Sequence, residues 1–325
     1  MRKVAIIGDG GWGTALALLL YAKGVDTVLW SVSPEYAEYL REKRENTKFL
    51  EGIVLPGGLK ITSDDFQVKG ADYAFFAVPC EYLRRVAERF KNAGFSCVIS
   101  AVKGIEQDSL KRPSEILKES FQGKDINVLS GPSIAFEVAN ESPTTIVIAS
   151  AGKEKKDIQA LMITESFRVY TSNDVIGVEL GGALKNIIAI AAGISDGLGF
   201  GTNSKSAILT RGLSEITRLG VKMGADERTF SGLSGVGDLA TTCISLHSRN
   251  RWFGEQIGKG RDIKSVMKET EKVVEGVATC RSAYKLAKKY DVDMPITQKV
   301  YEILYKGKDP ETAVKDLMRR NPKEE

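Results

Sequence analysis

The sequence predicts an α/β protein in which a doubly wound, mostly parallel sheet comes first and an all-helical domain follows. Three observations lead to this prediction: short β-branched or aromatic runs alternate with amphipathic segments in the first half, those runs stop near Val175, and helical patterns fill the remainder. We place the boundary so that residues 1–176 form the sheet domain and residues 177–325 the helical domain. No Ser-, Gly- or Pro-rich linker separates them, so we expect close packing around a cleft.

The expected strands are short and apolar, and segments with helical periodicity lie between them. The strand-like runs are KVAIIG, DTVLW, ADYAFFAV, FSCVISAV, INVLSG, TTIVIAS and FRVYTS. Helical periodicity occurs in the first domain at 34–44, 80–93 and 153–165, and in the second at 175–195, 204–223, 249–259, 276–290 and 309–319. Strands that alternate with helices in this way form parallel sheets.

Composition narrows the class of partner. The 46 basic and 42 acidic residues leave a net charge of only +4, too small to indicate nucleic acid or a membrane surface, so an acidic partner should be a small molecule. The cysteines are widely spaced and the chain has one histidine, which indicates a reduced cytoplasmic protein without a metal site. The first apolar run is too short for a signal peptide, and we expect no transmembrane segment. The oligomeric state stays open, with a homodimer among the alternatives.

A glycine-rich turn is the strongest local signal. In VAIIGDGGWGTALALLL, residues Gly8, Gly10 and Gly13 have the G-x-G-x-x-G spacing between an expected strand and an expected helix. Gly8 permits the tight turn, Gly10 lets a pyrophosphate approach the backbone, and Gly13 allows close helix packing. We therefore predict a dinucleotide site of the Rossmann type, with a merely structural turn as the alternative. Trp12 either covers the cofactor or packs against the second domain.

A lysine is the candidate proton donor. A carbonyl that accepts a hydride must also accept a proton, and the one histidine, His247, lies in the polar stretch CISLHSRNR, where we expect a solvent-facing loop. Lys185 instead sits within the apolar stretch GGALKNIIAI. The alternative is that Lys185 has no catalytic role and extends from a core helix to solvent.

Other polar residues lie where they could join Lys185. Lys103 closes an expected strand, at the edge of the sheet where open α/β folds bind ligands, and Gly131 and Ser133 follow the next strand. Asp238 lies in the glycine-rich stretch SGLSGVGDL, where it either caps a helix or holds the ammonium of a lysine.

The stretch SRNRWFG begins a predicted helix with a group of hydrogen-bond donors and cations. These are Ser248, Arg249, Asn250 and Arg251. Such a helix start suits a phosphate monoester, and a solvated basic surface is the alternative. Together with the two lysines and the aspartate, it indicates a pocket for a small phosphorylated carbonyl compound.

These residues resemble a family, the bacterial-type NAD(P)-dependent glycerol-3-phosphate dehydrogenases. The resemblance runs in order through nearly the whole chain, in IIGDGGWGTALA, LWSVSPE, AVKGIE, SGPSIAFEVA, FRVY, GVELGGALKNIIAIAAGISDGLGFGTNSKSAILTRGL, GVGDL, SRNR, VVEGV and MPIT. It implies interconversion of dihydroxyacetone phosphate and sn-glycerol 3-phosphate with NAD(P)H, which supplies glycerol 3-phosphate for phospholipid synthesis. The lysine of ALKN, here Lys185, is the implied general acid/base.

The resemblance also implies the remaining site residues. Catalytic roles fall on Lys185 and Asp238. Substrate contacts fall on Lys103, Gly131, Ser133, Lys185, Asn186, Asp238, Ser248, Arg249 and Asn250. Cofactor contacts, including the glycine motif, fall on Gly8, Gly10, Gly11, Trp12, Gly13, Val32, Lys103, Ala135, Arg249, Val273 and Glu275.

The sequence departs from the family pattern at two positions. GDGGWG replaces GAGSWG, so Asp9 adds a negative charge near the pyrophosphate turn, which should be neutral or slightly unfavourable unless the side chain points away. Val32 stands where a basic residue is frequent, in patterns such as LWARRPE. Because residues 30–33 provide neither carboxylate nor guanidinium, we expect both NADH and NADPH to be used, within about tenfold or 1.4 kcal/mol of each other.

Two other functions remain as alternatives from the residues themselves. One is a related dehydrogenase that acts on a small 2-hydroxy or 3-hydroxy acid. The other is a regulator that binds NAD(P) without turnover, which would have no need for Lys185 and Asp238 together.

Overall fold

The computed structural model describes residues 2–270, 273–322 and 324, and it divides into two compact units. The first unit extends to Glu179, except for the segment Gly104–Leu110. That segment belongs to the second unit, together with the chain from Leu180 onward.

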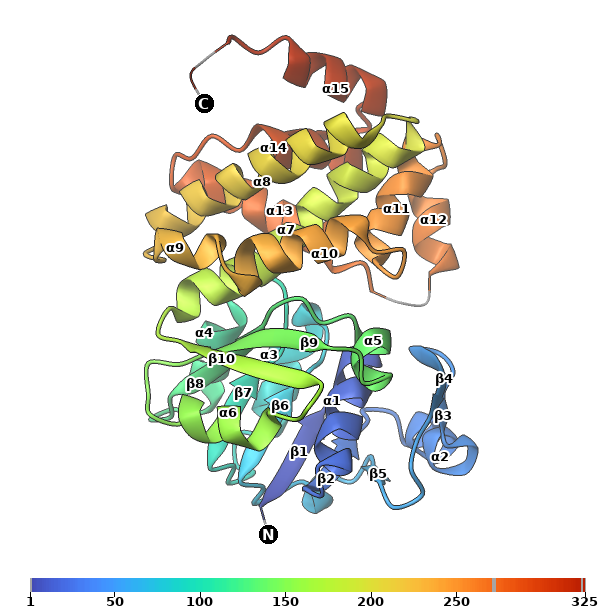
Figure 1. The fold of residues 1–325 in the computed structure, drawn as a ribbon, viewed down its shortest axis with the longest axis vertical. Helices are drawn as coiled ribbons and strands as arrows, with labels where there is room; N and C mark the ends of the chain where they lie inside the picture. The colour runs from blue at the N-terminus through green and yellow to red at the C-terminus, as the bar shows by residue number, and fades with distance from the viewer. Residues whose placement is uncertain (1, 271–272, 323, 325) are drawn as a thin grey trace. The chain divides into compact units, whose positions relative to one another are not determined.

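The first unit is built on a sheet whose strands run in the order β10-β9-β8-β7-β6-β1-β2-β5 (Figure 1). Every pair of neighbours is parallel except the antiparallel pair β8 and β9, so the predicted mostly parallel sheet is confirmed. In the centre, Ile7 of β1 pairs with both Trp30 and Phe76. The strand bounds are Lys3–Ile7 (β1), Asp26–Trp30 (β2), Lys60–Thr62 (β5), Tyr73–Phe76 (β6), Cys97–Ser100 (β7), Ile126–Ser130 (β8), Thr144–Ala149 (β9) and Phe167–Ser172 (β10).

Helices pack on both faces of this sheet, and each face has its own hydrophobic core. Along β1, Val4 and Ile6 enter one core, whereas Ala5 and Ile7 enter the other, which explains why the strand is apolar throughout. The helices of this unit are Gly11–Ala22 (α1), Pro34–Lys43 (α2), Cys80–Arg89 (α3), Pro113–Ser120 (α4), Ala135–Ala139 (α5) and Lys155–Met162 (α6), with a short 3-10 turn Asp65–Gln67 (η1). The strands Glu45–Asn46 (β3) and Leu50–Val54 (β4) form a separate antiparallel pair.

The second unit is helical in the part of the chain that the structure describes, as predicted. Its elements are Val175–Gly197 (α7), Thr202–Lys222 (α8), Glu227–Phe230 (α9), a π-helical turn Leu233–Gly237 (η2), Asp238–Ile244 (α10), Arg249–Gly258 (α11), Ile263–Glu269 (α12), Glu275–Lys289 (α13), Pro295–Lys306 (α14) and Pro310–Met318 (α15). The first residues of α7, up to Glu179, belong to the first unit.

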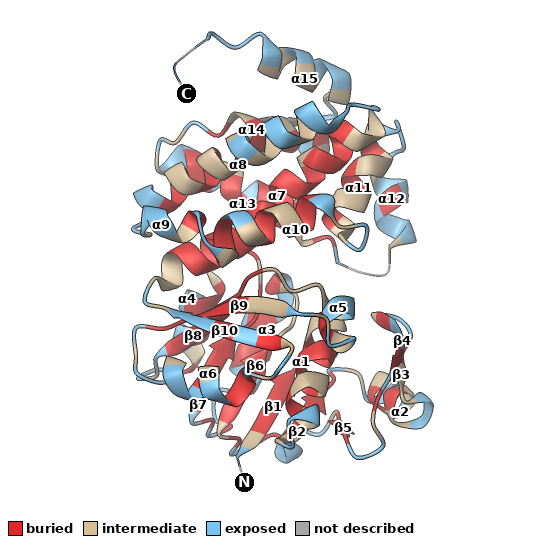
Figure 2. Cartoon of the chain, in the orientation of Figure 1, coloured by how far each residue is buried: buried red, intermediate tan, exposed pale blue. Residues whose placement is uncertain are grey.

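Helix α7 is long and apolar enough, by length and composition alone, to cross a membrane. In the structure 83 % of its most apolar window is buried, and Figure 2 shows the helix almost entirely in the colour of buried residues. Such burial is typical of the core helix of a globular domain. The functional candidate Lys185 belongs to this buried helix.

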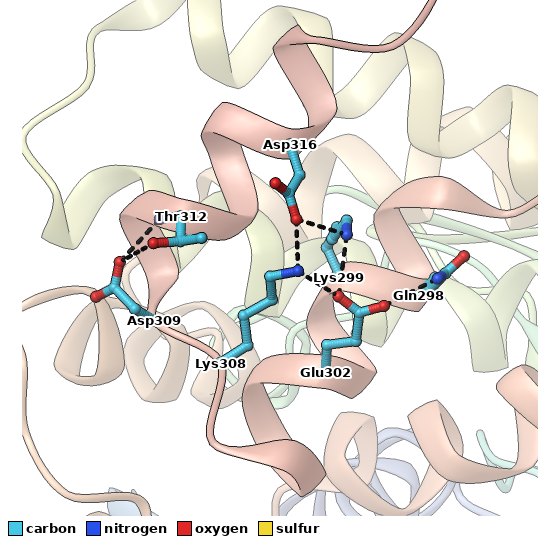
Figure 3. A network of polar contacts seen from close by, with 7 residues as sticks. All are labelled: Gln298, Lys299, Glu302, Lys308, Asp309, Thr312 and Asp316. Carbon is cyan, nitrogen blue, oxygen red and sulfur yellow. Dashed lines mark hydrogen bonds and ion pairs between the residues drawn. The ribbon is translucent and has the colours of Figure 1, made fainter.

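A cluster of charges joins α14 to α15, and we call Lys299, Glu302, Lys308 and Asp316 the surface charge cluster (Figure 3). Each lysine ammonium contacts both carboxylates, at distances of 2.5 to 3.0 Å. Hydrogen bonds from the two lysines, Lys308 first, lower the pKa of Asp316 to about 2. Partial burial opposes ionisation of Glu302, but hydrogen bonds from Lys308, Gln298 and Lys299 outweigh it and lower that pKa to about 2 as well. Both carboxylates therefore stay ionised over the whole neutral range.

Candidate functional site

The glycine loop between β1 and α1 leaves no room for a side chain at Gly8 or at Gly13. Gly8 has a φ of +122°, and a Cβ there would lie 2.8 Å from the carbonyl oxygen of Ala77. A Cβ on Gly13 would lie 1.9 Å from the carbonyl oxygen of Gly8, so α1 can start this close to β1 only without a side chain. A Cβ on Gly10, in contrast, meets no atom within 4 Å. The loop is therefore tight on the protein side and open at Gly10.

The start of α1 fits the phosphates of a dinucleotide. No side chain caps this helix and its first turn contains no acidic residue, so its amides and its dipole favour an anion. Gly11 is close to Ala135 at the start of α5, because a Cβ on Gly11 would lie 3.6 Å from that of Ala135. The indole Nε1 of Trp12 is a buried donor without an acceptor among the described residues. Of the predicted cofactor residues, the glycines, Trp12 and Ala135 thus lie around one open helix start, whereas Lys103 contacts Gly131 and Ser133.

Asp9 does not point away from the loop into solvent. Its carboxylate Oδ2 accepts a hydrogen bond of 2.5 Å from the hydroxyl of Ser31, the residue directly after β2. Burial raises the pKa of Asp9, while the bond from Ser31 and the charge of Lys48 act in the opposite direction. The neighbouring candidate Val32 is 53 % exposed.

Lys103, Gly131 and Ser133 come together at the ends of β7 and β8. The Nζ of Lys103 donates to the carbonyl oxygen of Gly131 at 3.0 Å and lies 3.4 Å from the hydroxyl oxygen of Ser133. Ser133 in turn donates to the same carbonyl at 2.9 Å. The expectation that Lys103 closes its strand is wrong in detail, because β7 ends at Ser100 and two residues, Ala101 and Val102, lie between them. From the irregular segment after the strand, the side chain reaches the end of β8.

Lys185 and Asp238 form a buried ion pair within the second unit. Their side chains are only 7 % and 1 % exposed. The ammonium also donates to the hydroxyl of Thr242 at 2.6 Å, and that hydroxyl donates to the backbone carbonyl of Asp238 at 2.6 Å. Lys185 does not extend to solvent, and Asp238 is the first residue of α10, after Gly237 as N-cap. Of the two alternatives for Asp238, the structure therefore shows the contact with a lysine.

Thr242 is a member of this cluster that sequence reasoning missed. It stands four residues after Asp238, one turn later on α10, so the two side chains share a face of the helix. A polar residue at that spacing from a candidate carboxylate is the signal that could have identified it. We call Lys185, Asp238 and Thr242 the buried charge cluster.

Close helix contacts hold the buried charge cluster and its surroundings in place. A Cβ on Gly254 of α11 would lie 2.1 Å from the carbonyl oxygen of Ile190, and one on Gly193 of α7 would lie 1.9 Å from that of Arg251. The backbones of α7 and α11 therefore pack directly on each other. This contact brings the start of α11 next to Asn186, the neighbour of Lys185.

Asn250 connects three helices at that point. Its Nδ2 donates to Oδ1 of Asn186 on α7 at 3.0 Å, and its own Oδ1 accepts from the amide of Gly276 on α13 at 2.9 Å. Ser248 is the N-cap of α11, its hydroxyl accepting from the amide of Arg251 at 3.3 Å. The predicted residues 248–250 thus lie at one helix start, one hydrogen bond away from the residue beside Lys185.

The two arginines of SRNR have different surroundings. Arg251 is paired with Asp196 through Nε at 2.8 Å and Nη2 at 2.7 Å. Arg249 has no hydrogen-bond or ion-pair partner among the described residues, and burial lowers its pKa to about 10. A partly buried guanidinium without a carboxylate is expected to receive an anion from elsewhere.

The remaining predicted residues lie at the surface or near it. Val273 is 39 % exposed and Glu275 is the first residue of α13. His247 is exposed in the loop between α10 and α11, where we expected it. No group of three or more His, Cys, Asp or Glu that could hold a metal ion occurs among the described residues.

Comparison with known proteins identifies a family along both units. The family model for the N-terminus of NAD-dependent glycerol-3-phosphate dehydrogenase matches residues 3–156, and the model for its C-terminus matches residues 174–315. A glycerol-3-phosphate dehydrogenase [NAD(P)+] from Chlorobium phaeobacteroides is 46 % identical over 99 % of both chains. One from Oceanobacillus iheyensis is 48 % identical over all of this chain and 96 % of the relative.

A solved structure is similar over the same extent. The crystal structure of glycerol-3-phosphate dehydrogenase from Coxiella burnetii has a TM-score of 0.95 to this chain and 36 % sequence identity. The similar region covers 98 % of this chain and 99 % of the chain from Coxiella burnetii.

Proposed function

Because the chain belongs to the family of NAD-dependent glycerol-3-phosphate dehydrogenases, its reaction is the interconversion of dihydroxyacetone phosphate and sn-glycerol 3-phosphate with NAD(P)H, and we propose that Lys185 is the general acid/base. The observation that supports this role is the buried charge cluster, in which Asp238 and Thr242 fix the Nζ of a lysine inside a helical core. The product supplies phospholipid synthesis.

Lys185 and its partners have separate tasks in this proposal. When bound, NAD(P)H supplies the hydride that C2 of the ketone accepts. The ammonium of Lys185 gives a proton to the oxygen on C2 as that carbon is reduced, and its neutral amine takes the proton back in the reverse direction. Asp238 compensates the buried positive charge and, with the hydroxyl of Thr242, fixes the direction in which Nζ points. Both act as positioning residues.

The start of α11 is proposed to bind the phosphate of the substrate. Arg249 is a partly buried guanidinium without a partner among the described residues, and it occupies the first turn of a helix. Asn250 holds this turn against Asn186. Lys103, Gly131 and Ser133 of the first unit remain predicted substrate contacts on the strength of their mutual hydrogen bonds.

The glycine loop and the start of α1 are the parts of the chain that fit the cofactor. Gly8, Gly10, Gly11, Trp12, Gly13 and Ala135 meet there. Val32, Arg249, Val273 and Glu275 stay predicted cofactor contacts. A cytoplasmic location, supported by composition, and a homodimer are likewise proposals.

The experiment that tests the function follows cofactor absorbance with dihydroxyacetone phosphate and with unphosphorylated dihydroxyacetone. We expect Arg249→Ala to lower kcat/KM for the phosphorylated ketone by about ten- to a hundredfold, since a charge-assisted contact contributes about 1.5 to 3 kcal/mol. Activity with dihydroxyacetone should hardly change. Arg251→Ala is the control for general damage to α11, because Arg251 already has Asp196 as partner. An equal loss for both ketones in Arg249→Ala would contradict phosphate recognition by this residue.

A further inference from the structure

Asp9 belongs to the glycine loop after β1, but its carboxylate lies at the end of β2. Strand β2 ends at Trp30, and Ser31 follows directly. The bond of 2.5 Å from the hydroxyl of Ser31 to Oδ2 of Asp9 ties the carboxylate to this point. Ser31 is itself fully buried, so its hydroxyl is a fixed anchor for Asp9.

The end of the second strand is where a dinucleotide fold distinguishes the two nicotinamide cofactors. A carboxylate there accepts hydrogen bonds from the ribose hydroxyls of NAD, and its charge repels the 2′-phosphate of NADP. In most such folds the acid stands about twenty residues beyond the glycines. Here residues 30–33 contain no acid, and the carboxylate comes from within the glycine loop.

The surroundings contain little to receive a 2′-phosphate. Val32 is exposed and apolar, and the hydroxyl of Ser33 donates to Glu35, adding a second carboxylate to the region. Lys48 is the cation whose charge acts on Asp9. The guanidinium of Arg89 lies over the ring of Trp30 but is paired with Asp65 at 2.7 Å. The net charge near the end of β2 is thus negative or neutral, which favours a free ribose.

We propose that Asp9 is the specificity residue of the cofactor site and makes the enzyme prefer NADH to NADPH. This deepens the proposed function, because it assumes that the glycine loop binds the dinucleotide of that reaction. It also replaces the expectation of nearly equal use, which considered only residues 30–33. We expect a preference for NADH of at least about a hundredfold, which corresponds to about 2.7 kcal/mol.

The test measures binding without catalysis. Dissociation constants of NADH and NADPH are determined by calorimetry in the absence of substrate, for the wild type, Asp9→Asn and Asp9→Ala. We expect the preference for NADH to fall below about tenfold in both variants, mainly because NADPH binds more tightly. Glu35→Gln is the matched control, because it removes another carboxylate of the same region, one that is not bonded to Ser31. This variant should keep most of the preference for NADH.

Two results would overturn the proposal: a wild type that binds both cofactors within tenfold, or an Asp9→Asn variant with an unchanged preference. If circular dichroism shows that the Asp9 variants do not fold, Ser31→Ala decides, because releasing the carboxylate should also reduce the preference. Failure of the proposed function has a different signature. In that case NADH still binds selectively, but dihydroxyacetone phosphate is not reduced.

Discussion

The second unit contains two clusters of lysines and carboxylates that differ in almost everything except composition. In the buried charge cluster, one ammonium and one carboxylate are nearly inaccessible, and the ammonium has one further partner, the hydroxyl of Thr242. In the surface charge cluster, two ammoniums and two carboxylates are mutually paired, with side chains 14 to 34 % exposed. Figure 3 shows the latter connecting two consecutive helices across their loop.

The comparison shows that burial determines how much a charge pair matters. A surface pair exchanges its partner for water at little cost. A buried pair offers no such exchange, so removing one member leaves an uncompensated charge in the core. Removing a partner from the buried charge cluster is therefore expected to cost far more stability than removing one from the surface charge cluster.

The largest effect is expected for Asp238→Ala. This change leaves the ammonium of Lys185 buried without its carboxylate, and we expect the free energy of unfolding to fall by about 3 to 5 kcal/mol, as measured by urea denaturation. The double variant Lys185→Met with Asp238→Leu should recover most of this loss while remaining inactive. A single variant as stable as the wild type would show that the pair does not behave as a buried one.

Lys185→Ala should act mainly on turnover. Loss of a positioned acid/base is expected to lower kcat by at least about a hundredfold. Cofactor binding, measured by calorimetry, should stay near the wild-type value. Lys308→Ala is the matched control from the surface charge cluster, and we expect its kcat to be unchanged. Ordinary turnover in Lys185→Ala would end its assignment as the general acid/base.

The smallest effect is expected for Asp316→Asn. At pH 7 the melting temperature should stay within about 2 °C of the wild type, because exposed pairs contribute little. The contribution of the surface charge cluster to stability depends on pH, because the pKa values of Asp316 and Glu302 are lowered to about 2 from ordinary values of 3.8 and 4.5. The contribution is complete above about pH 4.5 and is lost as the pH falls toward 2. The difference between variant and wild type should therefore narrow below pH 4.5, and a difference that widens there would contradict this assignment.

Much of the fold was predictable because its signals are local. Strand β1 is buried on both faces, so its apolar run is unmistakable, and after it Gly8 and Gly13 stand where a side chain would clash with the backbone. Strand β5 was missed because three residues are too few for a pattern. Helix α14 begins at Pro295 and was missed although its apolar residues follow a helical period. The antiparallel pairing of β8 with β9 depends on how the chain turns between them, which a single strand does not reveal.

Site residues were harder to predict because their contacts join distant parts of the chain. The pairs Lys185–Asp238 and Asn186–Asn250 span 53 and 64 positions. Family resemblance supplied these residues, but not Thr242, which is visible only once α10 exists. The contact of Asp9 with Ser31 was not predictable from residues 30–33 alone, because the carboxylate at the end of β2 comes from the loop before that strand.

The segment Gly104–Leu110 means that the chain passes from one unit to the other three times, after Lys103, after Leu110 and after Glu179. The hydroxyl of Ser282 on α13 is buried and donates to the carbonyl oxygen of Ile105 at 3.0 Å, so the helical unit is completed by a piece of the N-terminal half. A fragment that starts at residue 177 would lack that piece and with it the carbonyl acceptor of Ser282. Any dissection or domain exchange that keeps the second unit intact therefore has to carry residues 104–110 along with the helices.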